Sequence, residues 1–336
     1  MYILGIESSC DETSAAVVEM SDDCRRICSN IVASQIETHR LYGGVVPEIA
    51  SRAHVEAVSR ITSEALQEAG IGISDLGAVA VTTHPGLIGA LLVGVNFAKS
   101  MAYSRGIPLV SVNHIHAHVA AAYLSAPELR PPFLALVVSG GHTQLYTVED
   151  ELTWHCVGGT RDDAAGEAFD KIGRVIGMPY PGGAALDKLA YEGDKTAFTL
   201  PSPAITGDNL DFSFSGLKTA ALNLINSARQ RGEEINRADL AASYTDTIVR
   251  GLVKKTDDAL KKTGARTLVM AGGVAANSHL RAALTALCER RGVKFVVPPM
   301  ALCGDNGAMV AAAGYFRYRA GLTEGCDLNA SAADEM

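Results

Sequence analysis

Two histidines four residues apart are the clearest chemical signal in this sequence. His114 and His118 lie in the stretch Asn113-His114-Ile115-His116-Ala117-His118. On a helix, residues four apart share one face with their Cβ atoms about 5–6 Å apart. Two neutral imidazoles at that separation can bind one divalent metal ion. His116 points to another face and is not expected to bind. The alternative is a partly buried helix whose imidazoles are only its polar tips.

A metal held by two histidines leaves coordination positions open for a third protein ligand and for substrate or water. Asp305, in the stretch Cys303-Gly304-Asp305-Asn306-Gly307, lies where the last helix is expected to begin. It can act as the N-cap of that helix, because aspartate is a preferred N-cap residue. Its carboxylate can also supply the third metal ligand.

Three turns, each directly after a predicted buried strand, favour nucleotide binding when taken together. The first, residues 7–14, contains three acids and several hydroxyls, and an ordinary hairpin loop is the alternative. The second, Ser139-Gly140-Gly141, lets a phosphate approach the backbone because glycine has no Cβ. The third, residues 271–277, opens a helix at a place where a ribose or base can lie.

The order of predicted elements repeats itself after the Pro131-Pro132 break. Each half begins with three strands and continues with alternating helices and strands, and the second half adds further helices. The opening strands are predicted at residues 2–7, 15–19 and 27–35 in the first half and at 133–138, 144–148 and 154–157 in the second. This pattern predicts a duplicated α/β domain with a cleft between two lobes.

The charge is spread unevenly over the 336 residues, whose formal net charge is −8. Residues 1–150 hold 8 basic and 15 acidic residues, and the remainder holds 21 and 22, so only the second half has room for a basic face. The residues considered for such a face are Lys254, Lys255, Lys261, Lys262, Arg290 and Arg291. A solvated surface of mixed charge is the alternative.

Cysteine usage and the N-terminus favour a cytoplasmic protein. The seven cysteines are scattered, odd in number and without a C-x-x-C pair, which suits a reducing compartment. The N-terminal residues lack the basic region of a secretory signal. The longest apolar run, Leu87 to Val95, is interrupted by glycines and too short to cross a bilayer, so no membrane partner is expected.

Nearly the whole chain resembles the TsaD family, also called Gcp or YgjD. Three of the motifs that carry the resemblance are already described: His114 with His118, the turn Val138 to Thr143, and Asp305-Asn306-Gly307. The others are Gly5-Ile6-Glu7-Ser8-Ser9-Cys10-Asp11-Glu12-Thr13, Tyr42-Gly43-Gly44-Val45-Val46-Pro47-Glu48, Asp162-Asp163-Ala164-Ala165-Gly166-Glu167-Ala168-Phe169-Asp170-Lys171 and Asp211-Phe212-Ser213-Phe214-Ser215-Gly216. The tail after Asn329 is unlike much of the family and carries no motif.

The resemblance implies an α/β fold, the duplicated RNase H-like fold of the actin/Hsp70/sugar-kinase (ASKHA) superfamily, with two lobes and a central cleft. The N-terminal lobe is expected over residues 1–130, with the last helix, about 305–325, packing back near the cleft. The C-terminal lobe, with its helical insertions, is expected over residues 131–304.

The resemblance also implies a reaction. The threonylcarbamoyl group of threonylcarbamoyl-AMP is transferred to N-6 of adenosine 37, next to the anticodon, in tRNAs that read codons beginning with adenine. ATP or ADP is expected to be able to occupy the donor site. The implied partners are tRNA, a TsaB-like paralogue and a TsaE-like ATPase.

The resemblance further assigns residues to roles. The metal, Fe²⁺ or Zn²⁺, is implied at His114, His118 and Asp305, one ion per subunit. Substrate contacts are implied at Val137, Val138, Ser139, Gly140, Gly141, Asp170, Gly183, Asp187 and Asn277. Asp11, Glu12 and His142 are the candidates for removing the proton of the adenine amine, and the sequence does not choose among them.

Four other functions are considered, and each is compared with what the sequence contains. A kinase or ATPase of the same superfamily needs no two-histidine site. A zinc protease helix has glutamate directly after its first histidine, where this chain has Ile115. A non-catalytic assembly subunit has no need of the metal triad and the three turns. A carbamoyltransferase acting on a small molecule shares the donor chemistry and stays open.

Overall fold

The computed structural model describes residues 1–333 and divides into two compact units. The first unit consists of Met1–Leu129 and the chain from Pro298 onward, and the second is Arg130–Val297. Residues 298–304 therefore belong to the first unit, whereas the sequence placed them in the second lobe. The 3-10 turn η4 (Met300–Leu302) lies in this segment, and its Leu302 and the following Cys303 are buried there.

A five-stranded mixed sheet forms the centre of the first unit, in the order β3-β2-β1-β4-β5. β2 is antiparallel to both of its neighbours, β1 and β3. β4 and β5 continue the sheet parallel to β1. The strands are β1 (Tyr2–Glu7), β2 (Glu12–Met20), β3 (Arg25–Ser34), β4 (Leu76–His84) and β5 (Leu109–Asn113). The three opening strands lie where the sequence predicted them, with β2 longer at both ends.

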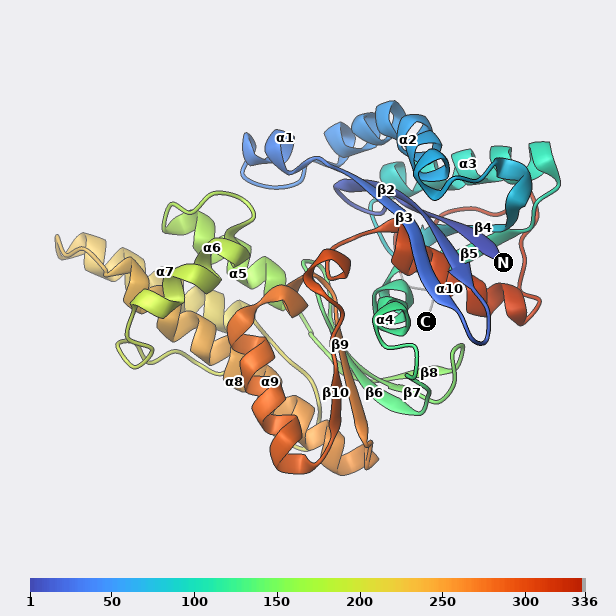
Figure 1. The fold of residues 1–336 in the computed structure, drawn as a ribbon. Helices are drawn as coiled ribbons and strands as arrows, with labels where there is room; N and C mark the ends of the chain where they lie inside the picture. Colours follow the sequence, from blue (N-terminus) through green and yellow to red (C-terminus); the bar gives the residue numbers. More distant parts are fainter. Residues whose placement is uncertain (334–336) are drawn as a thin grey trace. The chain divides into compact units, whose positions relative to one another are not determined.

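Helices cover both faces of this sheet. Their bounds are α1 (Ile36–Arg40), α2 (Pro47–Ala69), α3 (Ile88–Arg105), α4 (His114–Ser125) and α10 (Gly307–Arg319), with the 3-10 turn η1 (Ile73–Asp75). Leu4 and Ile6 of β1 share a core cluster with residues of α2 and α3. Gly5, which points the other way because side chains alternate along a strand, lies against α10. Figure 1 shows the red α10 beside the blue N-terminal strands and α4.

The last helix was expected to extend to about residue 325 but ends at Arg319. The chain then continues along the first unit, to which backbone hydrogen bonds connect it. The Glu324 amide donates to the Leu109 carbonyl at 2.8 Å, and the Ser331 amide donates to the Thr83 carbonyl at 2.9 Å. The tail without a motif is therefore hydrogen-bonded to the β4 and β5 side of the sheet.

The second unit repeats this topology. Its strand order is β10-β9-β6-β7-β8, with β6, β7 and β8 antiparallel and β9 and β10 parallel to β6. The strands are β6 (Phe133–Val138), β7 (Thr143–Val148), β8 (Trp154–Gly159), β9 (Thr267–Ala271) and β10 (Lys294–Val296). The helices are α5 (Ala165–Val175), α6 (Gly182–Leu189), α7 (Ser215–Gln230), α8 (Arg237–Thr263) and α9 (Ser278–Arg291), with the 3-10 turns η2 (Ala190–Glu192) and η3 (Gly273–Ala276). The predicted duplication is confirmed.

Two glycines allow the start of α10 to lie directly on β1 and β2. A Cβ on Gly5 would lie 2.1 Å from the Gly307 carbonyl oxygen and 2.5 Å from the Ala311 amide nitrogen. A Cβ on Gly307 would lie 2.6 Å from the Ala16 amide nitrogen. The Gly307 amide also donates to Ser14 Oγ of β2 at 2.8 Å. A side chain at either glycine would therefore push the helix off the sheet.

We predict that Gly5→Ala lowers the free energy of unfolding by about 1–3 kcal/mol, as expected for overpacking a closely packed core. Gly216→Ala is the matched control, because a Cβ on Gly216 of α7 meets nothing within 4 Å. That control should be neutral or slightly stabilising, because alanine favours a helix over glycine. Urea unfolding measures both, and equal midpoints for Gly5→Ala and the unsubstituted chain would contradict the packing argument.

Candidate metal centre and phosphate-binding turn

The histidine helix begins at its first histidine because Asn113 caps it. The Asn113 Oδ1 atom accepts hydrogen bonds from the Ile115 amide at 2.8 Å and the His116 amide at 3.2 Å. Because β5 ends at Asn113, the cap places His114 and His118 on the first two turns of α4. Both imidazoles are buried, and their ring centroids lie 4.6 Å apart. His114 and His118 therefore share one face of α4, as their four-residue spacing predicted.

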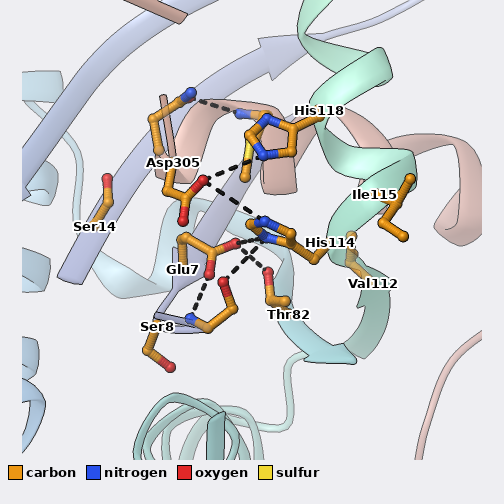
Figure 2. A network of polar contacts seen from close by, with 12 residues as sticks. Glu7, Ser8, Ser14, Thr82, Val112, His114, Ile115, His118 and Asp305 are labelled. Atoms are coloured by element: carbon orange, nitrogen blue, oxygen red, sulfur yellow. Dashed lines mark hydrogen bonds and ion pairs between the residues drawn. The ribbon is translucent and has the colours of Figure 1, made fainter. Parts of the chain in front are cut away.

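Asp305 meets the two histidines from the other end of the chain (Figure 2). Its Oδ1 atom lies 3.2 Å from His118 Nε2 and 3.6 Å from His114 Nε2. One ligand atom from each of the three residues lies within 4.8 Å of the others. The predicted N-cap role of Asp305 is wrong, because Asn306 caps α10 by accepting from the Met309 amide at 3.0 Å. The Asp305 carboxylate is thus available to the histidines.

The donor set fits a divalent transition metal. Both ring nitrogens of His118 are buried and have no hydrogen-bond partner, although Nε2 is close enough to Asp305 for an ion pair. The contact between His118 Nε2 and Asp305 does not meet hydrogen-bond geometry, so it leaves this buried nitrogen poorly satisfied. Two imidazoles and one carboxylate match the ligand preferences of zinc and of non-haem iron.

A buried carboxylate orients His114. Glu7, the last residue of β1, is fully buried, and its Oε2 atom lies 3.1 Å from His114 Nδ1. Thr82 Oγ1 donates to the same oxygen at 2.6 Å, and the Ser9 amide donates to Oε1 at 2.6 Å. With Nδ1 facing Glu7, the ring turns Nε2 toward Asp305, as carboxylate–histidine pairs do in metal sites.

Glu7 was not predicted as a site residue. In the sequence it is one of the three acids of the turn at 7–14 and part of the family motif from Gly5 to Thr13. The sequence signal that could have identified it is its place as the one acidic residue at the end of an otherwise apolar strand. A carboxylate buried there needs a charged or hydrogen-bonding partner, which points to a site.

The site is rich in negative charge. Burial lowers the pKa of His114, but the Asp305 and Glu7 carboxylates outweigh it and raise the pKa to about 9. Burial, together with Asp305 and Asp11, raises the pKa of Glu12 to about 9. In the absence of a bound cation, His114 is therefore protonated and Glu12 neutral at pH 7. Of the three candidate bases, Glu12 thus lies within electrostatic reach of Asp305, and Asp11 lies within reach of Glu12.

In the second unit, the glycine turn between β6 and β7 has open space around it. A Cβ on Gly140 or on Gly141 would meet no atom within 4 Å. The turn is closed by hydrogen bonds between Ser139 and His142, from the Ser139 amide to the His142 carbonyl at 2.8 Å and from the His142 amide to Ser139 Oγ at 3.1 Å. Packing does not require these glycines, so room for a ligand is the better reason for them.

A second turn lies beside the first because β6 and β9 are parallel neighbours, with Val137 opposite Ala271. Gly272 has a φ of +94°, and a Cβ there would lie 2.4 Å from the Val138 carbonyl oxygen. Asn277 then caps α9 by accepting from the Leu280 amide at 2.8 Å. The side chains of Val137 and Val138 are fully buried, so these residues offer a ligand their backbone only.

The other predicted substrate residues are also in this unit, on α5 and α6. Asp170 accepts a hydrogen bond from the Gly183 amide at 3.0 Å. Asp187 accepts from the Ser278 amide at 3.1 Å and from Ser278 Oγ at 2.8 Å, and its Oδ1 lies 2.9 Å from His279 Nδ1. Asp187 therefore supports the first turn of α9.

At the residues considered for a basic face, the structure favours the surface of mixed charge. Lys255 is only 1% exposed and donates to the carbonyls of Ile205 and Asn209 at 2.5 and 2.7 Å. Lys261 and Arg291 each pair with Asp257 at 2.7 Å. Lys262 pairs with Asp208. This face of α8 and α9 is a surface of mixed charge, which was the alternative interpretation.

No helix of residues 1–333 is long and apolar enough to cross a membrane.

The fold is similar to two solved structures. Component A of (R)-2-hydroxyglutaryl-CoA dehydratase from Acidaminococcus fermentans has a TM-score of 0.56 at 16% identity, covering 95% of this chain and 99% of that chain. Full-length HypF in its phosphate- and nucleotide-bound form has a TM-score of 0.62 at 14% identity, covering 99% of this chain and 47% of that one. With the two five-stranded sheets of matching order, these likenesses confirm the predicted α/β fold with a duplicated unit.

The sequence relatives narrow this class to one family. The profile of TsaD, tRNA N6-adenosine threonylcarbamoyltransferase, matches residues 26–312. The enzyme of that name from Clostridium botulinum is 50% identical over 328 residues, covering 98% of this chain and 96% of its own. That from Desulfitobacterium hafniense is 54% identical over 316 residues, covering 94% and 92%. The chain belongs to the TsaD family, and the resemblance found in the sequence is confirmed.

Proposed function

We propose that this chain transfers a threonylcarbamoyl group from threonylcarbamoyl-AMP to N-6 of adenosine 37 in tRNAs that read codons beginning with adenine. The observation that carries the proposal is identity of 50–54% over nearly the whole chain to enzymes named for this transfer. In the reaction, the adenine nitrogen attacks the carbamoyl carbon, the bond to the phosphate oxygen breaks, AMP leaves and N-6 loses a proton.

The turn Ser139 to Gly141 is suited to hold the AMP phosphate. The free space at Gly140 and Gly141 lets an anion approach the backbone. Asp170, Gly183, Asp187 and Asn277 complete the proposed donor site, and ATP or ADP can take the same place. The adenine amine is a weak nucleophile. Holding the donor in a fixed orientation speeds its attack, because orientation lowers the entropic part of the activation barrier.

The proposed cofactor is one Fe²⁺ or Zn²⁺ ion per subunit, held by His114, His118 and Asp305. When bound, such an ion would supply Lewis-acid chemistry, which would polarise a carbonyl or hold the threonyl group of the donor. Glu7 holds the proton of His114 at Nδ1 and so keeps Nε2 toward the ion. For proton removal from N-6, the candidates are Asp11, Glu12 and His142, and Glu12 qualifies only where a cation has lowered its pKa.

The proposal extends to partners and place. A TsaB-like paralogue and a TsaE-like ATPase are the proposed partners, and the cytoplasm is the proposed location. The mixed-charge surface of α8 and α9 supports a need for such partners in tRNA binding, because few phosphates can be neutralised there.

Depleting this protein should remove N6-threonylcarbamoyladenosine from cellular tRNA, as measured by mass spectrometry of tRNA nucleosides. Complementation with His118→Ala should fail to restore the nucleoside. His116→Ala should restore it, because His116 lies on the same helix but outside the cluster of proposed metal ligands. An unchanged nucleoside level after depletion would reject the proposed function and favour a small-molecule carbamoyltransferase or an ATP-dependent enzyme of the same fold.

Metal binding at pH 7 should release at least one proton per ion. His114 has a pKa of about 9 without metal, and it must give up the Nε2 proton to become a ligand. Metal affinity should therefore rise with pH up to about 9. Calorimetry in buffers of different ionisation enthalpy measures the proton count. Glu7→Gln, which removes one of the charges that raise this pKa, should reduce the count at pH 8, and no proton release at pH 7 would contradict the assignment.

A further inference from the structure

A pair of aromatic rings in close contact, the exposed Tyr191 and the half-buried His279, lies at the junction of α6 and α9 in the second unit. Tyr191, in the 3-10 turn η2, has its ring centroid 4.1 Å from that of His279, with 32° between the ring planes. The Tyr191 hydroxyl lies 2.9 Å from Ser278 Oγ. Tyr191 is nevertheless 67% exposed. The ring is thus held at one face and at its hydroxyl, while most of its surface is open to solvent.

One carboxylate holds both residues that position Tyr191. Asp187 accepts hydrogen bonds from the amide and the hydroxyl of Ser278 and pairs with His279 Nδ1 at 2.9 Å. Asp187 lies on α6, one helical turn before Tyr191. An aromatic ring that is already fixed loses little further conformational entropy when a ligand stacks on it. The arrangement is therefore preorganised for a flat ligand.

Tyr191 does not belong to a wider apolar patch. In the second unit, all of which the structure describes, the other exposed large hydrophobic side chains are Leu152 and Val175, at 39% and 38%. A protein partner that docks through apolar contact needs a contiguous patch. A single ring with an open face suits stacking, and aromatic rings stack with any nucleobase because every base has a π face.

We propose that Tyr191, backed by His279, is a stacking platform for a nucleobase. This inference rests on the proposed function, in which both substrates are nucleotides. Asn277, a proposed donor-site residue, directly precedes Ser278, and Asp187 belongs to the same set. The base comes either from the adenylate or from an unpaired position of the tRNA, since the two present the same chemistry.

The test compares Tyr191→Ala with Tyr191→Phe in the full chain, using AMP and an unmodified anticodon stem-loop RNA as separate probes. Tyr191→Ala should weaken binding of one probe about ten-fold, the usual effect of losing one stacked base. Tyr191→Phe keeps the ring and should bind within about two-fold of the unsubstituted chain. Loss of AMP binding alone identifies the base as that of the adenylate, and loss of RNA binding alone identifies it as that of the tRNA.

Gly141→Val separates this inference from the proposed function, because a side chain there fills the space proposed for the AMP phosphate. If Gly141→Val weakens AMP binding while Tyr191→Ala changes neither probe, the platform is wrong and the donor site stands. If the unsubstituted chain binds neither AMP nor RNA, both are wrong. Thermal melting of each variant shows whether a loss of binding reflects unfolding, and the exposure of Tyr191 predicts an unchanged melting temperature for Tyr191→Ala.

Discussion

The close approach of α10 to the sheet of the first unit is the constraint on which the candidate metal centre depends. Gly5 and Gly307 leave no room for a Cβ, and the Gly307 amide is bonded to Ser14 on β2. Asp305 directly precedes this contact, so its carboxylate is delivered to His114 and His118 by the packing of the helix. The contact of α10 with β1 and β2 thereby fixes the positions of three candidate ligands that are far apart in the sequence.

The electrostatics of the centre follow from the same burial. Glu7 and His114 are buried side by side, and such a pair is stable only when each partner satisfies the other. Asp305 and Glu7 raise the pKa of His114 to about 9, and burial together with Asp305 and Asp11 raises the pKa of Glu12 to about 9. A divalent cation would take the place of the protons on His114 and Glu12 and would reduce the repulsion between the carboxylates. The raised pKa values and the positions of the three side chains therefore both favour a bound cation.

The sequence predicted what local pattern determines. Helix spacing identified His114 and His118, and the strand and turn signals identified the repeated topology. Local preference also misled. Aspartate is a good N-cap, but Asn306 fills that place. The lysines near the end of α8 are paired with acids, Lys261 with Asp257 of the same helix and Lys262 with Asp208 from an earlier segment. Lys255 and Glu7 are buried, which depends on tertiary contacts that no short motif records.

The central claim is that His114, His118 and Asp305 hold one metal ion. The most direct measurement is X-ray absorption spectroscopy, with elemental analysis, of the purified chain and of Asp305→Asn, which keeps the shape of the side chain but removes its charge. We predict one ion per chain with two imidazole ligands in the unsubstituted protein, and weaker retention of the metal in Asp305→Asn. An ion without imidazole scattering, or full retention by His114→Ala/His118→Ala, would contradict the account.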